Sequence, residues 1–134
     1  MARPLLKVLL VTEAIDVELL ARNWITYHES DDINYFWAVE IITELILTEP
    51  QSAWAILKKI NKFSKNHALI DYLDGILGAG LLEDLIHGEK HDLAKDIIIS
   101  AGDDARLKKQ LSYMYIRDTL SRDIKYLVTE LLGR

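Results

Sequence analysis

The chain has 134 residues and a formal net charge of −5; half of its residues are apolar and 28% are charged. This length and balance fit one globular domain that buries about two-thirds of its unfolded surface, and they exclude a disordered or fibrous chain. Because the sequence contains no Cys, disulfide frameworks and thiolate metal sites are excluded, and a reducing cytoplasm is the favoured compartment.

The amino-terminal stretch MARPLLKVLLV has only some features of a targeting signal. Arg3 precedes an apolar run, but Lys7 interrupts that run, and Glu13 and Asp16 follow it closely. We see no small-residue cleavage site and no apolar stretch of the roughly 20 residues that span a bilayer. We therefore expect a soluble, cytoplasmic protein that does not interact with a membrane.

Negative charge is concentrated in the first part of the chain. Residues 1–50 carry nine acidic and three basic side chains, whereas residues 103–134 carry five acidic and seven basic ones. An acidic surface disfavours nucleic acid as a ligand, since phosphate binding requires a basic face. It suits a basic protein partner, although the charge could equally serve solubility alone.

Apolar residues recur at helical spacing along almost the whole chain, first in a stripe from Ile15 to Trp24. This pattern predicts a first helix that ends near His28. Residues 5–11, at its start, could instead form a short strand. A polar loop follows, in which Asp31 or Asp32 can cap the next helix.

The second predicted helix covers about residues 33–47. It is apolar around most of its circumference, so we expect it to be central, with Glu40 and Glu44 on its narrow exposed side. The junction Thr-Glu-Pro-Gln at residues 48–51 fits a capping box, with a proline in the first turn of a third helix over about residues 50–63.

The fourth predicted helix has its apolar stripe between Leu69 and Leu77, and Asn66 can cap it. Its pattern ends at the sequence GAGLLEDLIHG, residues 78–88. We interpret this sequence as a tight corner, where two glycines let packed helices approach closely. Later apolar stripes predict helices over residues 91–101, along residues 107–114 and along residues 120–131.

Turns of two to five residues between these helices imply antiparallel neighbours. We therefore predict an all-α fold of seven or eight short antiparallel helices in a single domain, residues 1–134. Two arrangements remain open: a HEAT-like stack of helical hairpins and an irregular bundle.

Candidate metal ligands lie at the end of the glycine-rich sequence. Glu83, His87 and His91 are spaced four apart and would form a row on one continuous helix. Gly88 argues against continuity, so we expect Glu83 and Asp84 to serve a helix start and His87 a helix end, without metal or cofactor. No serine or carboxylate shows a catalytic pattern. We expect no enzymatic activity, with a metal-dependent hydrolase as an alternative.

The aromatic and basic clusters have structural interpretations. Trp24, Trp37 and Trp54 each lie on the apolar stripe of their own helix, so we expect core residues rather than a stacking platform. The lysines of residues 58–65 cluster near the end of the third helix, where positive charge is favourable to the helix dipole.

Several short motifs resemble a small bacterial α-helical domain family of unknown function. The matching residues are Trp24 and Tyr27, Phe36-Trp37-Ala38, Pro50 with Ala53-Trp54, and the block Ala79–Ile86 followed by Gly88. The last block corresponds to the family pattern Ala-Gly-x-Leu-Glu-Asp-Leu-Leu, in which the family has proline where this chain has Leu81. The similarity covers about residues 19–115 and leaves residues 116–134 outside it.

This resemblance implies a helical fold without established catalysis. Members of the family resemble proteins encoded beside secreted bacterial toxins, as in contact-dependent inhibition, where small acidic proteins act as immunity factors. The resemblance thus implies a protein that binds and neutralises a toxin domain, and a helical adaptor with another partner is the alternative. The family-motif residues, which we expect to be structural, are Trp37, Trp54, Gly80, Glu83, Asp84 and Gly88.

The expected partner surface is the acidic stretch between the first and third helices. No Lys or Arg lies between Asn23 and Gln51. Glu49 follows the end of the second helix, where negative charge is unfavourable to the helix dipole. We therefore expect a basic toxin domain to bind here. The carboxylates of this surface are Glu29, Asp31, Asp32, Glu40, Glu44 and Glu49.

Overall fold

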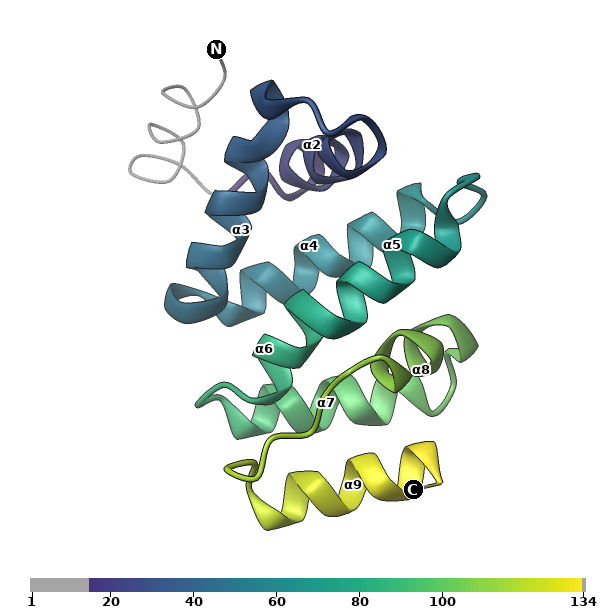
Figure 1. Cartoon of the computed structure of the whole chain (residues 1–134). Coiled ribbons are helices and arrows are strands. Elements are labelled where there is room, and N and C mark those ends of the chain that lie inside the picture. The colour runs from purple at the N-terminus through teal and green to yellow at the C-terminus, as the bar shows by residue number, and fades with distance from the viewer. Residues whose placement is uncertain (1–14, 134) are drawn as a thin grey trace. The chain divides into compact units, whose positions relative to one another are not determined.

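A computed structural model of the chain describes residues 15–133, and every regular element in that range is helical (Figure 1). The prediction of an all-α fold is confirmed for this part of the chain. The question of helix or strand at residues 5–11 lies outside the described residues. The elements are α2 (Val17–Ser30), the 3-10 turn η1 (Ile33–Tyr35), α3 (Phe36–Thr48), α4 (Pro50–Phe63), α5 (Ile70–Leu77), the π-helical η2 (Gly78–Leu82), α6 (Glu83–Ile86), α7 (His91–Ala101), α8 (Ala105–Ser112) and α9 (Arg122–Leu132).

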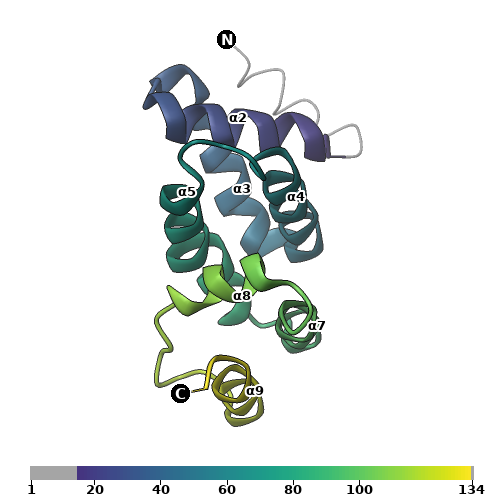
Figure 2. The same ribbon diagram turned by 90° about the vertical axis from the view of Figure 1, so that its right-hand side faces the viewer.

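The chain divides into two compact units, Met1–Ile70 and Asp71–Arg134. In the first unit α2, α3 and α4 pack on one another, and α2 lies across the other two helices (Figure 2). In the second unit α8 packs on η2, and α7 packs on both α6 and α9. Packing within each unit is bundle-like, and the single domain over residues 1–134 stays a prediction.

Aromatic side chains fill the core of the first unit. Trp24, Trp37 and Trp54 come from three different helices and are 4%, 6% and 8% exposed. Because buried aromatic rings remove large apolar areas from water, they dominate the energetics of such a core. The prediction that all three are core residues is confirmed.

Helix ends in the first unit follow the predicted chemistry only in part. The Asp32 carboxylate accepts a hydrogen bond from the Asn34 N–H at 3.0 Å and so caps η1, while Asp31 ends α2 in a left-handed conformation with φ of 56°. The predicted capping box at residues 48–51 is wrong. Thr48 is the last residue of α3, and its hydroxyl donates to a carbonyl of the preceding turn at 3.1 Å. α4 therefore begins at Pro50 without a side-chain cap.

The predicted cap at Asn66 is not formed either. Turns occupy residues 64–66 and 68–69, and α5 begins only at Ile70. His67 takes the local role instead, since its Nδ1 accepts the Leu69 N–H at 2.9 Å.

The glycine-rich sequence is part of a continuous helix. α5, η2 and α6 follow one another without a break from Ile70 to Ile86. The prediction of a corner at residues 78–88 is therefore wrong for its first part, because no helix ends at Gly78 or Gly80. It is confirmed for its last part, because His87 and Gly88 close the helix. Glycine ends a helix most readily when it adopts a positive φ. Within residues 15–133 only Gly133 does so among the glycines.

Gly78 permits a close approach between helices instead. A Cβ atom on Gly78 would lie 1.8 Å from the carbonyl oxygen of Gln110, which is in α8. This approach brings the Gln110 side chain to Asp74, whose Oδ1 accepts hydrogen bonds from Gln110 Nε2 and Arg106 Nε, both at 2.9 Å. A Cβ atom on Gly80, by contrast, would meet nothing within 4 Å. The expected close approach is thus confirmed at Gly78 and not at Gly80.

The later helices agree well with the sequence pattern. The predicted helix over residues 91–101 is observed as α7 with the same bounds. The predicted helix along residues 107–114 ends earlier, at Ser112, although Met114 is buried beyond it. In α9, Ile124 and Val128 form the buried stripe.

The first prediction concerns the two helical glycines. Gly78→Ala should destabilise the protein by about 1–3 kcal/mol or more, because its methyl group would overlap a backbone carbonyl that cannot move without displacing α8. Gly80→Ala should leave stability unchanged or raise it by up to about 1 kcal/mol, since alanine favours a helix. Urea unfolding of both variants measures the difference. Equal midpoints would show that the α8 contact does not require glycine.

Candidate functional site

The six predicted partner-binding carboxylates lie in the first unit, along α3 and the turns at its two ends. Exposed carboxylates at the start of α3 come from Glu29, Asp31 and Asp32, and those at its end come from Glu44 and Glu49. A helix of 13 residues is about 20 Å long. The predicted carboxylates are therefore spread along the length of α3, mostly at its two ends, and do not form one compact cluster.

Two of the three carboxylates at the start of α3 have structural roles. Glu29 Oε2 lies 2.7 Å from His67 Nε2. Asp31 closes α2 through its own backbone N–H, which donates to the Tyr27 carbonyl at 2.7 Å. Asp32 caps η1. The side chains of Glu29 and Asp32 are thus explained by the fold and carry less weight as a partner surface, whereas the exposed Asp31 has a structural role through its backbone alone.

Glu44 and Glu49 are different. Both are exposed, and neither carboxylate makes a hydrogen bond or an ion pair with any residue from 15 to 133. Glu40 is only partly exposed and has an interaction of its own. The negative charge most accessible to a partner is thus at the carboxyl-terminal end of α3.

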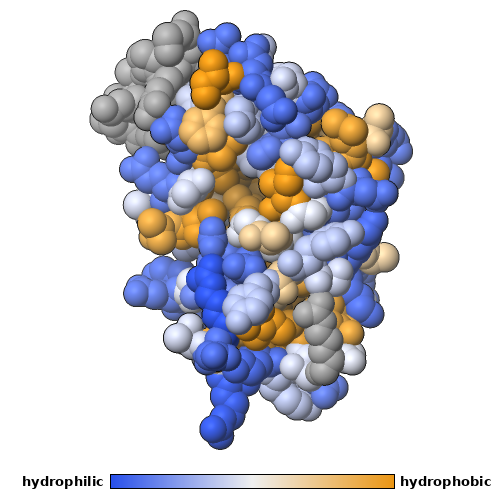
Figure 3. All heavy atoms as spheres, in the orientation of Figure 1, coloured by the Kyte–Doolittle hydropathy of each residue, from blue (hydrophilic) through white to orange (hydrophobic). Residues whose placement is uncertain are grey.

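Two exposed aliphatic side chains accompany the acidic residues. Ile33, in η1, is 72% exposed and Leu47, near the end of α3, is 85% exposed. On the face shown in Figure 3, apolar side chains reach the surface between hydrophilic ones around α2, α3 and α4. We define the α3 end surface as Glu44, Leu47 and Glu49. It combines an apolar contact with flanking charge, which is how protein interfaces are commonly built.

His28 lies in the last turn of α2, close to the acidic turn. Its ring centroid is 4.2 Å from that of Trp24. Burial lowers the pKa of His28 below the ordinary value of 6.5, and the charge of Asp31 partly opposes this shift. The lowered pKa favours the neutral form of His28, so this residue offsets the carboxylates around it less than an ordinary histidine would.

The family-motif carboxylates of the second unit hold the segment between α8 and α9. Arg117 Nη2 donates to Glu83 Oε2 and to Asp84 Oδ1, each at 3.1 Å, and these hydrogen bonds raise the pKa of Arg117. Glu83 Oε1 also accepts the Tyr115 N–H at 2.7 Å. The prediction that Glu83 and Asp84 serve a helix start is wrong, because the helix there is continuous and both side chains bind a later segment.

His87 belongs to the same cluster. Its Nε2 accepts the backbone N–H of Arg117 at 3.0 Å, and its Nδ1 lies 2.8 Å from the carbonyl oxygen of Glu83. Since an amide N–H can only donate, Nε2 is unprotonated and Nδ1 carries the proton. Both ring nitrogens are thus occupied by the backbone. His91 begins α7 on the exposed side.

These positions bear on the hydrolase alternative. Among residues 15–133 no group of three or more His, Asp or Glu side chains is arranged to hold a metal ion.

Sequence reasoning did not find Arg117, which lies outside the family resemblance. Its partners are 33 and 34 residues away, so no local pattern could have indicated the cluster.

The comparisons with known proteins matched nothing: the chain fits none of the protein-family models scanned, and the searches of curated proteins and solved structures found no similar protein. The resemblance to a bacterial helical family therefore stays a prediction. In the part of the chain from residue 15 to residue 133, no helix is long and apolar enough to cross a membrane.

The second prediction concerns the charge balance at the end of α2. An NMR titration of His28 should give a pKa below 6.5, because burial disfavours the imidazolium form. Asp31→Asn should lower this pKa further, since it removes the one charge that raises it, and asparagine tolerates the left-handed conformation of this position.

The depressed pKa also predicts a pH dependence of stability. A folded-state pKa below the unfolded value of 6.5 means that the unfolded chain binds protons first. The contribution of His28 is therefore complete above pH 6.5 and is lost as the pH falls through 6.5 towards the folded pKa. A pKa that rises in Asp31→Asn would contradict this assignment.

Proposed function

We propose that this protein is a cytoplasmic immunity protein, which binds and neutralises a bacterial toxin domain without catalysing a reaction. The observation that carries the proposal is the α3 end surface, where two carboxylates that make no hydrogen bond or ion pair with residues 15–133 flank an exposed leucine. No Lys or Arg between Asn23 and Gln51 offsets this charge.

The position of these carboxylates supports a role outside the fold. Glu44 lies near the carboxyl-terminal end of α3, where the helix dipole presents partial negative charge, whereas Glu49 caps this end and also precedes the first turn of α4, where negative charge is favourable. The contact of Glu44 with the dipole is unfavourable by at most about 0.3–1 kcal/mol at low ionic strength, and α3 has no basic residue in its last turn. A basic partner would relieve this repulsion. Binding at this surface would therefore gain energy that folding alone does not.

Leu47 supplies the second part of the surface. An aliphatic side chain that is 85% exposed gains free energy when a partner buries it, since about 25 cal/mol is gained per Å² of apolar area. The flanking charges steer a basic partner and set its orientation, while the leucine slows its release. A basic toxin domain with an apolar pocket between its cationic side chains is the partner that fits.

A helical adaptor for another basic protein would use the same surface. The two proposals are therefore separated by a test of whether the protein protects cells from a toxin. We would express the protein together with the product of the gene directly upstream of its own, which immunity predicts to be a toxin. Immunity predicts that the cells survive and that the two proteins co-purify. Death of the cells despite expression of both proteins would exclude immunity and leave the adaptor.

The third prediction concerns the rate of association with that toxin domain. The double variant Glu44→Lys/Glu49→Lys should reduce the association rate constant at least about tenfold at low salt, because electrostatic steering contributes factors of 10 to 10³. Stopped-flow fluorescence at several salt concentrations measures this effect. The difference between the variant and the native protein should shrink as salt is added.

The matched control is Glu89→Lys/Asp96→Lys. It makes the same change in net charge at two exposed positions of the second unit, so it should alter the rate much less. If both double variants slow association equally, net charge rather than the α3 end surface controls the encounter, and this assignment of the surface fails.

A further inference from the structure

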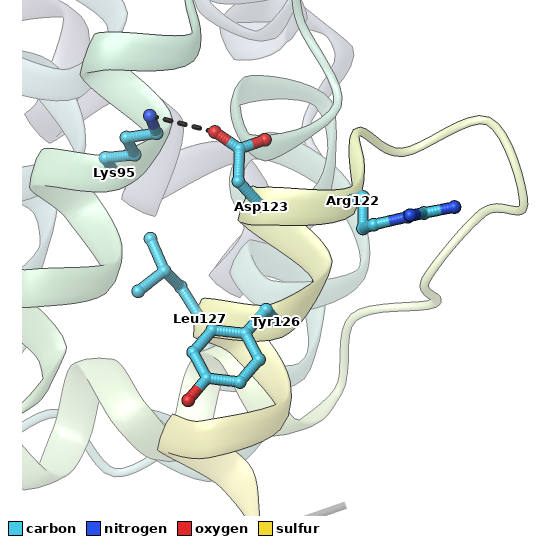
Figure 4. Close-up of a pocket in the computed structure, with 5 residues that line it drawn as sticks. All are labelled: Lys95, Arg122, Asp123, Tyr126 and Leu127. Carbon is cyan, nitrogen blue, oxygen red and sulfur yellow. Dashed lines mark ion pairs between the residues drawn. The ribbon is translucent and has the colours of Figure 1, made fainter.

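An open pocket of about 750 Å³ lies between α7 and α9 in the second unit (Figure 4). Its volume is within the range of small-molecule sites. The residues that line it are Lys95, Arg122, Asp123, Tyr126 and Leu127. None of them belongs to the α3 end surface or to the Arg117 cluster, so the pocket has no role in the function proposed above.

One side of the pocket is apolar. Leu127 points from α9 towards α7, and the Tyr126 ring lies beside it (Figure 4). Tyr126 is 62% exposed, because the buried stripe of α9 is formed by Ile124 and Val128 on another side of the helix. This leaves an aliphatic group and an aromatic ring open to solvent at the same place.

The polar side of the pocket is held by an ion pair. Lys95 Nζ lies 2.9 Å from Asp123 Oδ2, and the Ser121 hydroxyl donates to Asp123 Oδ1 at 2.9 Å. The hydrogen bonds from Lys95 and Ser121 lower the pKa of Asp123 to about 2. The carboxylate is thus ionised at neutral pH and has a partner on each oxygen.

The unused hydrogen-bonding groups are donors. An ammonium group has three N–H donors, and Lys95 uses one of them on Asp123. Arg122 makes no hydrogen bond or ion pair within the described range, residues 15–133. Its guanidinium points away from Lys95 (Figure 4). The residues that line the pocket thus include two cations and one carboxylate, and the charge of Asp92 also acts on Lys95 from outside the lining.

We propose that this pocket binds a small organic anion with an apolar body, such as a medium-chain or aromatic carboxylate. The carboxylate accepts hydrogen bonds from the N–H groups of Lys95 that Asp123 does not use, because charge-assisted hydrogen bonds are the strongest that such a donor can make. The apolar body covers Leu127 and the Tyr126 ring. The ligand therefore needs both parts, and neither a bare anion nor a neutral hydrocarbon satisfies the whole pocket.

Octanoate and 1-octanol test the proposal, since they share an apolar chain and differ in charge. Titration into the labelled full-length protein, followed by amide chemical shifts, should show saturable changes at residues 95 and 122–127 with octanoate. The affinity for 1-octanol should be at least about fivefold lower. Equal affinity for the two compounds, changes centred elsewhere, or changes that do not saturate would each overturn the proposal.

Two variants should shift octanoate affinity in opposite directions. Lys95→Gln removes the positive charge and its charge-assisted hydrogen bonds and leaves Asp123 facing the anion, so it should weaken binding about tenfold. Asp123→Asn releases Lys95 and removes a negative charge, so it should tighten binding severalfold. Exposed ion pairs contribute little to stability, so both variants should fold, as circular dichroism can verify.

Lys108→Gln is the matched control. It removes the same charge from an exposed position on α8 that does not line the pocket, and octanoate affinity should change less than twofold. If Asp123→Asn weakens binding, or if Lys108→Gln weakens it as much as Lys95→Gln does, the pocket is not the binding site.

Discussion

The backbone of Gly78 lies directly against the carbonyl group of Gln110, and the second unit depends on this approach. It holds α8 on the long helix formed by α5, η2 and α6, and it brings the Gln110 side chain within hydrogen-bonding distance of the buried Asp74. The chain then leaves α8 as an extended segment, which Arg117 fixes to α6. Because this segment is fixed, α9 begins beside α7, where Asp123 meets Lys95. The pocket lies at this meeting of α7 and α9.

The sequence predicted the bounds of a helix well where the residue that sets the bound lies at the end of that helix. Pro50 marks the start of α4 and Gly102 follows the end of α7, so the predicted bounds of both helices match the structure. The glycine-rich sequence was interpreted wrongly for a physical reason. A glycine that breaks a helix and a glycine that admits a neighbouring backbone look the same in sequence, and the neighbour at Gln110 lies 32 residues away along the chain.

The candidate site, too, could be predicted from the sequence only in part. Sequence identified the acidic stretch around α3, since charge is visible residue by residue. It could not separate Asp32, which caps η1, from Glu44 and Glu49, whose carboxylates make no hydrogen bond or ion pair with other described residues. That difference depends on hydrogen bonds and on exposure, which exist only in the fold. Glu83 and Asp84 show the converse case: a conspicuous acidic pair has a structural role, because Arg117 binds both carboxylates.

Binding of a basic toxin domain at the end of α3 is the central claim, and amide hydrogen exchange of the complex tests it most directly. Comparison of the free and bound protein should show slower exchange across residues 43–52, where a partner on Glu44, Leu47 and Glu49 would cover the backbone. Residues 91–101 of α7 should exchange at the same rate in both states. Slower exchange confined to α7 and α9, with no change at residues 43–52, would contradict the claim.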